Sequence, residues 1–476
     1  MSDLDQPPAR AGRGPSVQEL LAADSKPVPA ALLDHPSADV GAAEVPKSRY
    51  TSASFAELEA RYVFGRTWQM ACMEVELARV GDHVVYDVAD QSYLVVRGRD
   101  GVIRAFHNAC LHRGTKLRDR DGRAASFRCP FHGWRWELDG TLVELPGSWD
   151  FPDIVNDPTR SCLPQVPVAT WQGFVFLNPD PGAEPFETYA GKLIEHFGGA
   201  YRFDRRYKAF HAVKEVPANW KVVMEAFSEG YHSIATHPQI LPFTADDTSE
   251  YSVWADSPHT TRFVNAFGVQ SPHLGTLTEQ QVADAYLGFF AGRTAGDTEL
   301  ADGQAARPVV AALMRDAMAE RFRCDLEWLT DCEVLDAILY HLFPAFAPWA
   351  GIGQPLVYRW RPGATPDTSF MDVIRLAPIP DGVDVPDPAP ITVLSLEQPW
   401  SDAPGMGGLA GVFEQDMANL PRVQAGLYSR GKPTVTFSRY QEGRLRHIHQ
   451  MIDRYILSGI DADGGDPATV GPFLVR

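Results

Sequence analysis

Two cysteine-histidine pairs are the residues of this chain whose types and spacing point most directly to chemistry. The first pair is Cys110 and His112 and the second is Cys129 and His132, so the motif reads C-x-H followed by C-x₂-H. Each pair offers one thiolate and one imidazole from a short turn, and both groups are common metal ligands. Two sulfurs and two nitrogens fit tetrahedral zinc. They also fit an iron–sulfur cluster in which the cysteines hold one iron and the histidines hold the other.

The spacing of these four residues favours the cluster over zinc. Zinc fingers group cysteine with cysteine and histidine with histidine, whereas each turn here is mixed, as a site that spans two irons requires. Residues 110–134 resemble the binding loops of Rieske proteins, with Arg113-Gly114 after the first histidine and Gly133-Trp134 after the second. The resemblance implies a Rieske [2Fe–2S] cluster, and structural zinc is the alternative. Its ligands would be Cys110, His112, Cys129 and His132.

A second candidate stretch runs from Asn219 to His237. Asn219 can cap a helix, and apolar residues at helical spacing predict its buried stripe. The stripe comprises Trp220, Val223, Phe227, Tyr231 and Ile234. Glu229 and His232 share a helix face, but His237 lies off that face and precedes Pro238, so we expect the helix to distort or end there. Taken alone, H-x₄-H is better interpreted as two structural histidines.

Length and composition set the class of protein that must position these residues. A chain of 476 residues exceeds what one hydrophobic core usually serves, so two domains are expected. With 45% hydrophobic and 22% charged residues the composition is that of a globular protein. A net charge of −18 repels phosphate backbones and anionic lipids, which argues against nucleic acid or a membrane as partner.

The first domain is predicted to be all-β. Residues 1–45 are rich in Pro, Ala and Ser and indicate a mobile N-terminal arm with one short helix near 17–23. Residues 46–180 then show a period of two, which predicts short strands, and Asp-Gly pairs predict hairpins between them. The strands are expected at 84–88, 93–96, 102–106 and 171–177, and the Asp-Gly pairs lie at 100–101, 121–122 and 139–140. The cluster loops would lie at hairpin tips.

Residues 181–476 form the second predicted domain. It opens with a strand at 207–216 and contains an insert, about 275–345, that we expect to hold three helices covering a pocket. One begins with the capping box Thr278–Gln281, and the others span 306–321 and 326–343. Eight aromatic residues in and around the insert suit a bulky apolar substrate. They are Phe267, Phe289, Phe290, Trp328, Tyr340, Phe343, Phe346 and Trp349. A late helix, 438–457, carries His447 and His449, predicted to be surface or packing residues.

With the cluster loops and E-x₂-H-x₄-H in this order, the chain resembles the catalytic α subunit of a Rieske non-haem iron oxygenase. The resemblance implies an α+β fold, in which an all-β Rieske domain precedes a helix-grip catalytic domain of the Bet v 1 or START type. It also implies a mononuclear Fe(II) held by His232, His237 and a carboxylate from a late helix. Asp416 is our choice for that carboxylate, and Glu414 is second.

The family resemblance sets the expected activity. It is that of a terminal oxygenase that uses O₂ to hydroxylate an aromatic or other bulky apolar substrate, as in aromatic hydrocarbon catabolism. Two positions depart from the common pattern, because Glu229 replaces a frequent Asp and Ala226 a frequent Asn. Glu at the first position resembles the branch that acts on quaternary amines, so oxidative demethylation or quaternary-amine monooxygenation is the alternative. An electron-transfer Rieske protein without chemistry of its own is the alternative of another class.

Partners and location complete the expectations. Gly405, Gly407 and Ala410 match a dinucleotide pattern, but no strand precedes them, so electrons from NAD(P)H should arrive through a ferredoxin or a reductase. The family implies a homotrimer, with or without a β subunit, in which Glu229 links His232 to the partner subunit's His132. No signal peptide is visible, and the apolar stretch 335–353 is interrupted by charged and proline residues. These features predict a cytoplasmic protein.

Overall fold

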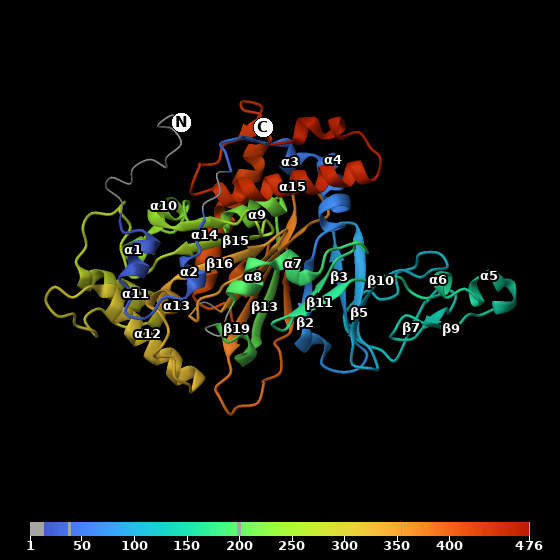
Figure 1. Cartoon of the computed structure of the whole chain (residues 1–476), viewed down its shortest axis with the longest axis horizontal. Helices are drawn as coiled ribbons and strands as arrows, with labels where there is room; N and C mark the ends of the chain where they lie inside the picture. The colour runs from blue at the N-terminus through green and yellow to red at the C-terminus, as the bar shows by residue number, and fades with distance from the viewer. Residues whose placement is uncertain (1–13, 37–39, 198–200, 354, 476) are drawn as a thin grey trace.

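The computed structural model of the protein describes residues 14–36, 40–197, 201–353 and 355–475. Along the chain, several small β-sheets come first, and a large sheet crossed by long helices follows (Figure 1). The fold therefore mixes helix and sheet in the expected order, a part built on small β-sheets with short helices before a part built on one large sheet and long helices. This arrangement agrees with the predicted α+β class.

Two small sheets form the body of the first part. Their strand orders are β10-β5-β4-β3-β6 and β11-β12-β2. The strands are β2 (Gln69–Met73), β3 (Asp82–Val88), β4 (Gln91–Arg97), β5 (Ile103–His107), β6 (Gly122–Arg123), β10 (Gln165–Val166), β11 (Val168–Trp171) and β12 (Phe174–Leu177). The three earliest predicted strands are present as β3, β4 and β5. The single strand predicted at 171–177 is instead a hairpin of β11 and β12, which turns at Gly173 with φ of 80°.

One predicted hairpin is wrong. Gly122 lies in strand β6 and not at a turn, because β6 pairs with β3. The Asp121 side chain accepts a hydrogen bond from the Val85 N–H at 2.8 Å and so fixes the approach to β6. The Asp-Gly pairs at 100–101 and 139–140 do make turns, with Gly101 and Gly140 at φ of 81° and 88°.

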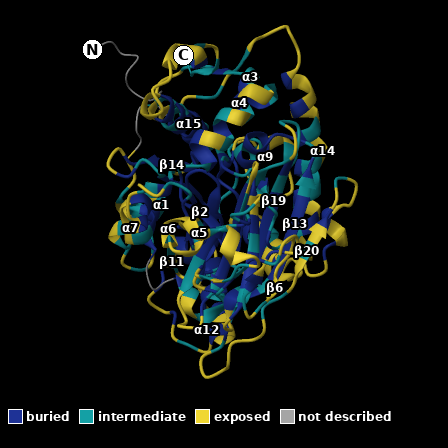
Figure 2. Ribbon diagram, turned by 90° about the vertical axis from the view of Figure 1, so that its right-hand side faces the viewer, coloured by how far each residue is buried: buried dark blue, intermediate teal, exposed yellow. Residues whose placement is uncertain are grey.

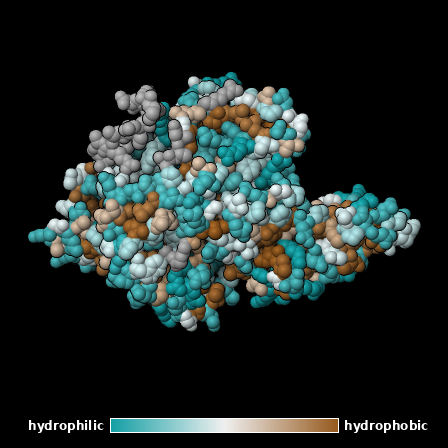
Figure 3. Space-filling view, viewed as in Figure 1, coloured by the Kyte–Doolittle hydropathy of each residue, from teal (hydrophilic) through white to brown (hydrophobic). Residues whose placement is uncertain are grey.

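A third small sheet carries the second cluster loop away from the rest of the molecule (Figure 1). It consists of β7 (Phe127–Arg128), β8 (Arg135–Trp136) and β9 (Leu142–Glu144), followed by short helices α5 (Pro152–Val155) and α6 (Pro158–Ser161). A separate hydrophobic cluster that includes Phe106, Phe127, Trp134 and Trp136 joins this sheet to β4 and β5. The space-filling view shows this part as a projecting lobe (Figure 3).

The second part is built on an eight-stranded sheet with the order β14-β15-β16-β17-β18-β19-β13-β20. Neighbouring strands are antiparallel, except that β20 runs parallel to β13. The strands are β13 (Arg206–Val216), β14 (Glu250–Val253), β15 (Thr260–Asn265), β16 (Ala337–Leu342), β17 (Phe346–Pro348), β18 (Leu356–Pro362), β19 (Ser369–Pro378) and β20 (Ile391–Leu394). The predicted strand at 207–216 is therefore confirmed as β13.

Three helices lie along this sheet next to the candidate site. They are α9 (Trp220–Ala226), α14 (Leu409–Leu427) and α15 (Gly443–Ala462). The largest hydrophobic cluster joins these helices to strands β13, β18 and β19. Exposed residues lie on the outer side of the helical layer and buried residues lie beneath it (Figure 2). This packing agrees with the expected helix-grip arrangement.

The insert contains two of its three predicted helices. Helix α11 (Glu279–Ala291) begins with the predicted Thr278 capping box, and α12 (Ala306–Phe322) matches the second prediction. The third prediction, a helix over 326–343, is wrong. Only the short α13 (Asp331–Leu335) is helical there, and β16 follows it between β15 and β17. A short apolar run fits a helix and a fully buried strand equally well, and the neighbouring strands decide.

The N-terminal segment packs against the second part. Helices α1 (Val17–Ala22) and α2 (Ala30–Leu33) place the side chains of Val17, Leu21 and Leu32 in a hydrophobic core. Arg262 on β15 donates to the Ala31 and Asp34 carbonyls at 2.5 and 2.8 Å. For the described residues the prediction of a mobile arm is therefore wrong, although the predicted short helix is present. Residues 1–13 lie outside the described part of the chain.

No helix in the described part of the chain combines the length and the apolar character that a bilayer crossing needs.

Candidate functional site: two sets of metal-ligating side chains

The four predicted cluster ligands lie on two matching turns. In the first turn the Gly114 N–H donates to the Cys110 carbonyl at 2.9 Å, and in the second the Gly133 N–H donates to the Cys129 carbonyl at 3.1 Å. Gly114 and Gly133 have φ of 75° and 81°, a backbone conformation that disfavours residues with a side chain. Glycine therefore closes both turns, and β7 and β8 flank the second one.

The side chains of the two turns face one another. The rings of His112 and His132 have centroids 4.5 Å apart, and His112 stacks on Trp134 at 5.4 Å. Cys110 and Cys129 are both buried, and their thiols hydrogen-bond to each other. Burial raises the pKa of Cys110. Burial also acts on Cys129, but hydrogen bonds from the backbone N–H groups of Phe131 and His132, together with the bond from Cys110, outweigh it and lower the pKa of that thiol.

The donor set fits a two-iron cluster. Nδ1 of His112 is buried and has no hydrogen-bond partner, which is the state expected of a nitrogen reserved for a metal. Among the described residues, these four do not supply three ligand atoms within 4.8 Å of one another. A single zinc ion with Zn–S and Zn–N bonds of about 2.0–2.3 Å requires such convergence. The wider spacing fits two irons better than one zinc.

The second predicted set lies where helix α9 breaks. Asn219 caps α9 as predicted, but the helix ends at Ala226, well before the histidines. A separate short helix, α10 (Ser233–Thr236), has His232 and His237 at its two ends. The predicted buried stripe is accordingly wrong in its second half, because Tyr231 is 54% and Ile234 39% exposed. The break turns both imidazoles to the same side.

Helix α14 brings the carboxylate. Asp416 Oδ1 lies 3.1 Å from His237 Nε2 and 3.6 Å from His232 Nε2, and all three ligand atoms lie within 4.8 Å of one another. Asp416 is buried. Glu414 is two positions away on the helix, about 200° around its axis, and its carboxylate instead accepts a hydrogen bond from the Trp400 N–H. The structure thus gathers His232, His237 and Asp416 and leaves Glu414 outside.

A side-chain oxygen accepts a hydrogen bond from the Nδ1 atom of each imidazole. Glu229 Oε1 lies 2.6 Å from His232 Nδ1, and Gln415 Oε1 lies 2.8 Å from His237 Nδ1. A proton on each Nδ1 leaves each Nε2 lone pair free for a metal. Burial would lower the pKa of His232, but the Glu229 and Asp416 carboxylates outweigh it and raise that pKa. Glu229 belongs to the predicted E-x₂-H-x₄-H motif, whereas Gln415 belongs to no motif and was not predicted, although it adjoins Asp416 in the chain.

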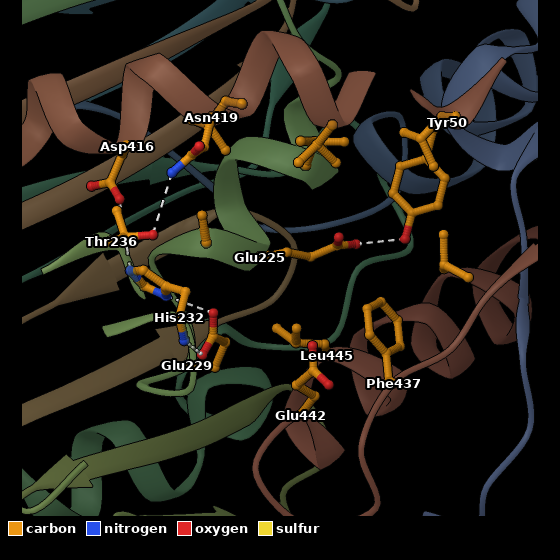
Figure 4. A pocket seen from close by; sticks show the side chains of 16 residues that line it. Tyr50, Glu225, Glu229, His232, Thr236, Asp416, Asn419, Phe437, Glu442 and Leu445 are labelled. Carbon is orange, nitrogen blue, oxygen red and sulfur yellow. Dashed lines mark hydrogen bonds and ion pairs between the residues drawn. The ribbon is translucent and has the colours of Figure 1, made fainter. Parts of the chain in front are cut away.

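A cavity of about 260 Å³ opens beside this set (Figure 4). Its lining includes His232 and Asp416 and three further carboxyl groups, those of Glu225, Glu229 and Glu442. Lys and Arg are absent from the described residues that line it. The aromatic side chains in the lining are Tyr50 and Phe437. The eight aromatic residues in and around the insert do not line this cavity, and Phe267, Tyr340, Phe343 and Phe346 are buried.

The two late histidines do not join the metal-ligating sets. His447 Nε2 lies 2.7 Å from the Pro258 carbonyl, and His449 Nε2 lies 2.8 Å from Glu225 Oε1. Both are buried within helix α15, as packing residues. Glu225, Tyr50 and Glu442 are neighbours of the site that were not predicted from the sequence. Tyr50 and Glu442 are far from Glu225 in the chain, and neither belongs to a motif.

Two family models match the chain. The model of the ring hydroxylating alpha subunit catalytic domain matches residues 201–458, and that of the Rieske [2Fe-2S] domain matches residues 67–157. All residues of both ligand sets lie inside these ranges. The two matches together imply a Rieske cluster and a mononuclear iron.

Known relatives match over part of their length. The carnitine monooxygenase oxygenase subunit of Acinetobacter pittii is 34% identical over 218 residues, which are 45% of this chain and 56% of the relative. The chlorobenzene dioxygenase subunit alpha of Cupriavidus sp. is 32% identical over 194 residues, 39% of this chain and 42% of the relative. The chain thus spans about half the length of the curated relatives it matches.

A solved structure shares the fold over most of both chains. It is a quaternary ammonium Rieske monooxygenase in complex with L-carnitine, which aligns with a TM-score of 0.60 at 21% identity. The alignment covers 87% of this chain and 95% of that one. At this identity the likeness concerns the fold alone.

Proposed function

This chain belongs to the ring-hydroxylating alpha subunits that carry a Rieske domain, and we propose that it is the terminal oxygenase component of a Rieske non-haem iron oxygenase system. The observation that carries the proposal is the convergence of His232, His237 and Asp416 in the same chain as the cysteine-histidine turns. Two histidines and one carboxylate on one face of a metal are the ligand pattern of non-haem Fe(II) oxygenases.

We assign a ligand set to each group. The cluster would be held by Cys110, His112, Cys129 and His132, and the iron by His232, His237 and Asp416. When bound, the cluster supplies one-electron transfer and the iron supplies the position for O₂. Two neighbouring side chains orient the histidine ligands. Glu229 and Gln415 fix the imidazole orientations, so that both Nε2 atoms converge on Asp416.

The domain division remains part of this proposal. We place the N-terminal arm at residues 1–45, the Rieske domain at 46–180 and the catalytic domain at 181–476. Support comes from the sheets, because strands β2 to β12 pair only with one another among the described residues, and β13 begins the large sheet. The family models fall on either side of the second boundary.

The substrate is proposed to be a small organic molecule, with two candidate classes. An aromatic or bulky apolar substrate is the first, and chlorobenzene dioxygenase is a relative of that kind. A quaternary amine, oxidised with loss of a methyl or larger group, is the second, and carnitine monooxygenase is a relative of that kind. The Glu229, Glu442 and Asp416 carboxyl groups at the cavity and the lack of Lys or Arg in its described lining favour the second class, because a cation is attracted to such a site.

Electrons are proposed to come from NAD(P)H through a ferredoxin or a reductase. We further propose a homotrimer, with or without a β subunit, in the cytoplasm. Support comes from apolar side chains at two separate places. Phe131 and Trp149 are 57% and 84% exposed on the projecting lobe, and Tyr231 and Val423 are exposed near the cavity. Mutual burial of two such surfaces would stabilise an assembly of identical chains.

Substrate-dependent O₂ uptake tests the proposal. The full chain, with iron and cluster loaded and a ferredoxin and reductase pair supplied, is mixed with arenes, methoxyarenes, steroids and quaternary amines. Oxygen uptake that one class stimulates, with ¹⁸O from ¹⁸O₂ in the product, is expected. An electron carrier without chemistry of its own would take up no substrate-dependent O₂ and incorporate no label. Preference for arenes over quaternary amines would contradict the second substrate class alone.

A further inference from the structure

Glu225 lines the same cavity as His232 and Asp416, but it does not belong to the metal-ligating set (Figure 4). Its side chain is 14% exposed. Glu225 Oε1 accepts a hydrogen bond from the Tyr50 hydroxyl at 2.8 Å and lies 2.8 Å from His449 Nε2. The Tyr50 hydroxyl and His449 Nε2 are themselves 2.9 Å apart. Tyr50 on α3 (Ser48–Thr51) and His449 on α15 thus both contact Oε1 of Glu225 on α9.

This geometry accommodates Glu225 in either protonation state. Both contacts end on Oε1, which can accept from Tyr50 and His449 whether it is a carboxylate oxygen or the carbonyl oxygen of a carboxylic acid. Oε2 is then the oxygen that remains for the cavity. A proton on Oε2 can be exchanged with water there without breaking the bonds that position the side chain.

The cations near Glu225 are paired with other carboxylates. Lys221 Nζ lies 2.8 Å from Glu59, and Arg49 Nη1 lies 2.6 Å from Asp453. Glu442 adds negative charge from the start of α15. Burial and the Glu442 carboxylate therefore outweigh the Tyr50 hydrogen bond and the two cations, and they raise the pKa of Glu225 to about 8. Glu225 is protonated at pH 7 and loses its proton as the pH rises through that value.

His449 and Tyr50 stay neutral in this range. Burial and the charges of Arg49 and Lys221 hold the pKa of His449 well below its usual value, and burial raises that of Tyr50 well above its own. Glu225 is therefore the member of the trio that changes charge near neutral pH. Across the cavity it is faced by Glu229 and Asp416.

The cavity provides a path for protons. A volume of about 260 Å³ holds several water molecules, and its lining extends from Glu225 to His232 and Asp416. Carboxyl groups along the wall can hydrogen-bond to such waters. Proton exchange between Glu225 and the metal position therefore needs water in one cavity and no movement of the chain.

We propose that Glu225 is the proton-holding residue of this site, which releases a proton into the cavity during turnover and regains one from solvent afterwards. The inference rests on the proposed oxygenase function. Insertion of one oxygen atom follows R–H + O₂ + 2 e⁻ + 2 H⁺ → R–OH + H₂O, so each turnover consumes two protons. In the step assigned to Glu225 the Oε2–H bond breaks, its proton passes to a cavity water, and a proton of that water moves on toward the reduced oxygen. The carboxylate left behind keeps its bonds from Tyr50 and His449 until solvent reprotonates it.

Infrared titration of the full chain, without substrate, tests the proton-holding state directly. A protonated-carboxyl C=O band is expected at pH 7 and should disappear with a midpoint near pH 8. Glu225→Gln, which keeps the size of the side chain but has no titrating proton, should lack this band. Identical titrations of the native protein and Glu225→Gln would overturn the proposal.

Two neighbours should move the midpoint in opposite directions. Tyr50→Phe removes a donor that favours the carboxylate, so the midpoint should rise. Glu442→Gln removes a negative charge, so the midpoint should fall. These variants keep the test decisive even if Glu225→Gln fails to fold. Shifts in the reverse directions, or no shift in either variant, would count against the assignment.

Turnover provides the second readout. With iron, cluster and redox partners supplied, Glu225→Gln should react about 10²-fold more slowly and release more H₂O₂ per O₂ consumed. The rate of the native protein should decline as the pH rises through about 8, because Glu225 loses its proton there, and the variant should show no such decline. A purely structural Glu225 predicts that the variant keeps the native pH profile and coupling. A native protein that oxidises no substrate would end the oxygenase proposal. If the native protein turns over as an oxygenase but Glu225 titrates near the usual pKa of a glutamate, only this inference is wrong.

Discussion

Asp416 and Glu414 carry the same functional group on the same helix, yet their surroundings differ. Asp416 points its carboxylate at two imidazole nitrogens, whereas Glu414 accepts a hydrogen bond from the backbone at Trp400. Among the described residues, His232 and His237 are the ion-pair partners of Asp416, so a bound metal or a proton must balance this buried carboxylate. The metal-binding role is therefore expected of Asp416.

Replacement of each carboxylate separates the two roles. Asp416→Ala should abolish turnover and lower the affinity for mononuclear iron by more than the roughly 10–100-fold that loss of a ligand's supporting partner costs. Glu414→Ala is the matched control and should keep both properties. Iron per chain is measured by elemental analysis, and the visible spectrum reports the cluster, which should be unchanged in both variants. Loss of iron from Glu414→Ala with full iron in Asp416→Ala would contradict the assignment.

Residue types in motifs could be read from the sequence, but their supporting partners could not. The spacing of His232 and His237 taken alone favours two structural histidines, whereas the resemblance to Rieske oxygenases predicts that they bind iron, and the structure places them together. Gln415 had no such signal, because its contact with His237 depends on how α14 crosses α10. Glu225 is similar, since its partners Tyr50 and His449 come from opposite ends of the chain. Contacts of this kind follow from tertiary packing and not from spacing.

At the level of elements, the segment 326–343 shows where local pattern fails. Its apolar residues fit a helix, yet Ala337–Leu342 forms a strand that is buried throughout. Arg307 on α12 donates to both oxygens of Asp336, at 2.7 and 2.8 Å, directly before that strand. A buried strand between two others loses the alternation that would reveal it. The helices α11 and α12 match their predictions, and α11 begins with the predicted Thr278 capping box.

The N-terminal helices allow a stability test with an internal control. Leu32 is 3% exposed and its neighbour Leu33 is 52% exposed, although both lie on α2. Leu32→Ala should lower the free energy of unfolding by about 2–3 kcal/mol, because it leaves a cavity in the core. Leu33→Ala should change it by about 0.5 kcal/mol or less. Denaturant titrations of both variants measure the difference, and equal effects would mean that the arm is not packed as described.

The two cluster turns allow a test of whether they bind an iron–sulfur cluster or zinc. Cys110→Ser should remove or alter the visible colour and the electron paramagnetic resonance signal of the reduced cluster, because serine cannot replace a thiolate ligand at iron without changing the cluster. Cys162→Ser lies outside both turns and is the control, with an unchanged spectrum expected. A colourless native protein that binds zinc would contradict the cluster assignment.

At the scale of the whole molecule, the two ligand sets occupy different regions of the chain. The second cluster turn lies on the projecting lobe, whereas the iron ligands lie at the ends of α10 and on α14 in the body of the protein (Figure 1). Electron transfer between them is expected to cross a subunit interface, with the lobe of one chain against the body of the next. The exposed Trp149 and Phe131 at the lobe are suited to such a contact.

Glu229 is the residue proposed to join the two metals across that interface. Its Oε1 lies 2.6 Å from His232 Nδ1, and its Oε2 accepts the His232 backbone N–H at 3.1 Å. Each carboxylate oxygen can accept a further bond, so Oε2 retains capacity for a ring N–H from His132 of the partner subunit. An ordinary surface ion pair would instead be worth about 0–1 kcal/mol and would matter little.

Glu229→Gln distinguishes these two roles. The amide keeps the shape of the carboxylate but removes its charge, so the variant should retain its oligomer, its cluster colour and most of its iron. Electron transfer from the reduced cluster to the iron should fall by orders of magnitude, because the charged link between the two imidazoles is lost. Glu195→Gln is the control, since Glu195 forms an exposed pair with Lys192 at the same i, i+3 spacing. Single-turnover mixing of the reduced enzyme with substrate and O₂ follows cluster oxidation, while sedimentation measures the assembly. Native-like cluster oxidation in Glu229→Gln, or full activity of the native protein as a monomer, would show that electrons reach the iron without this bridge.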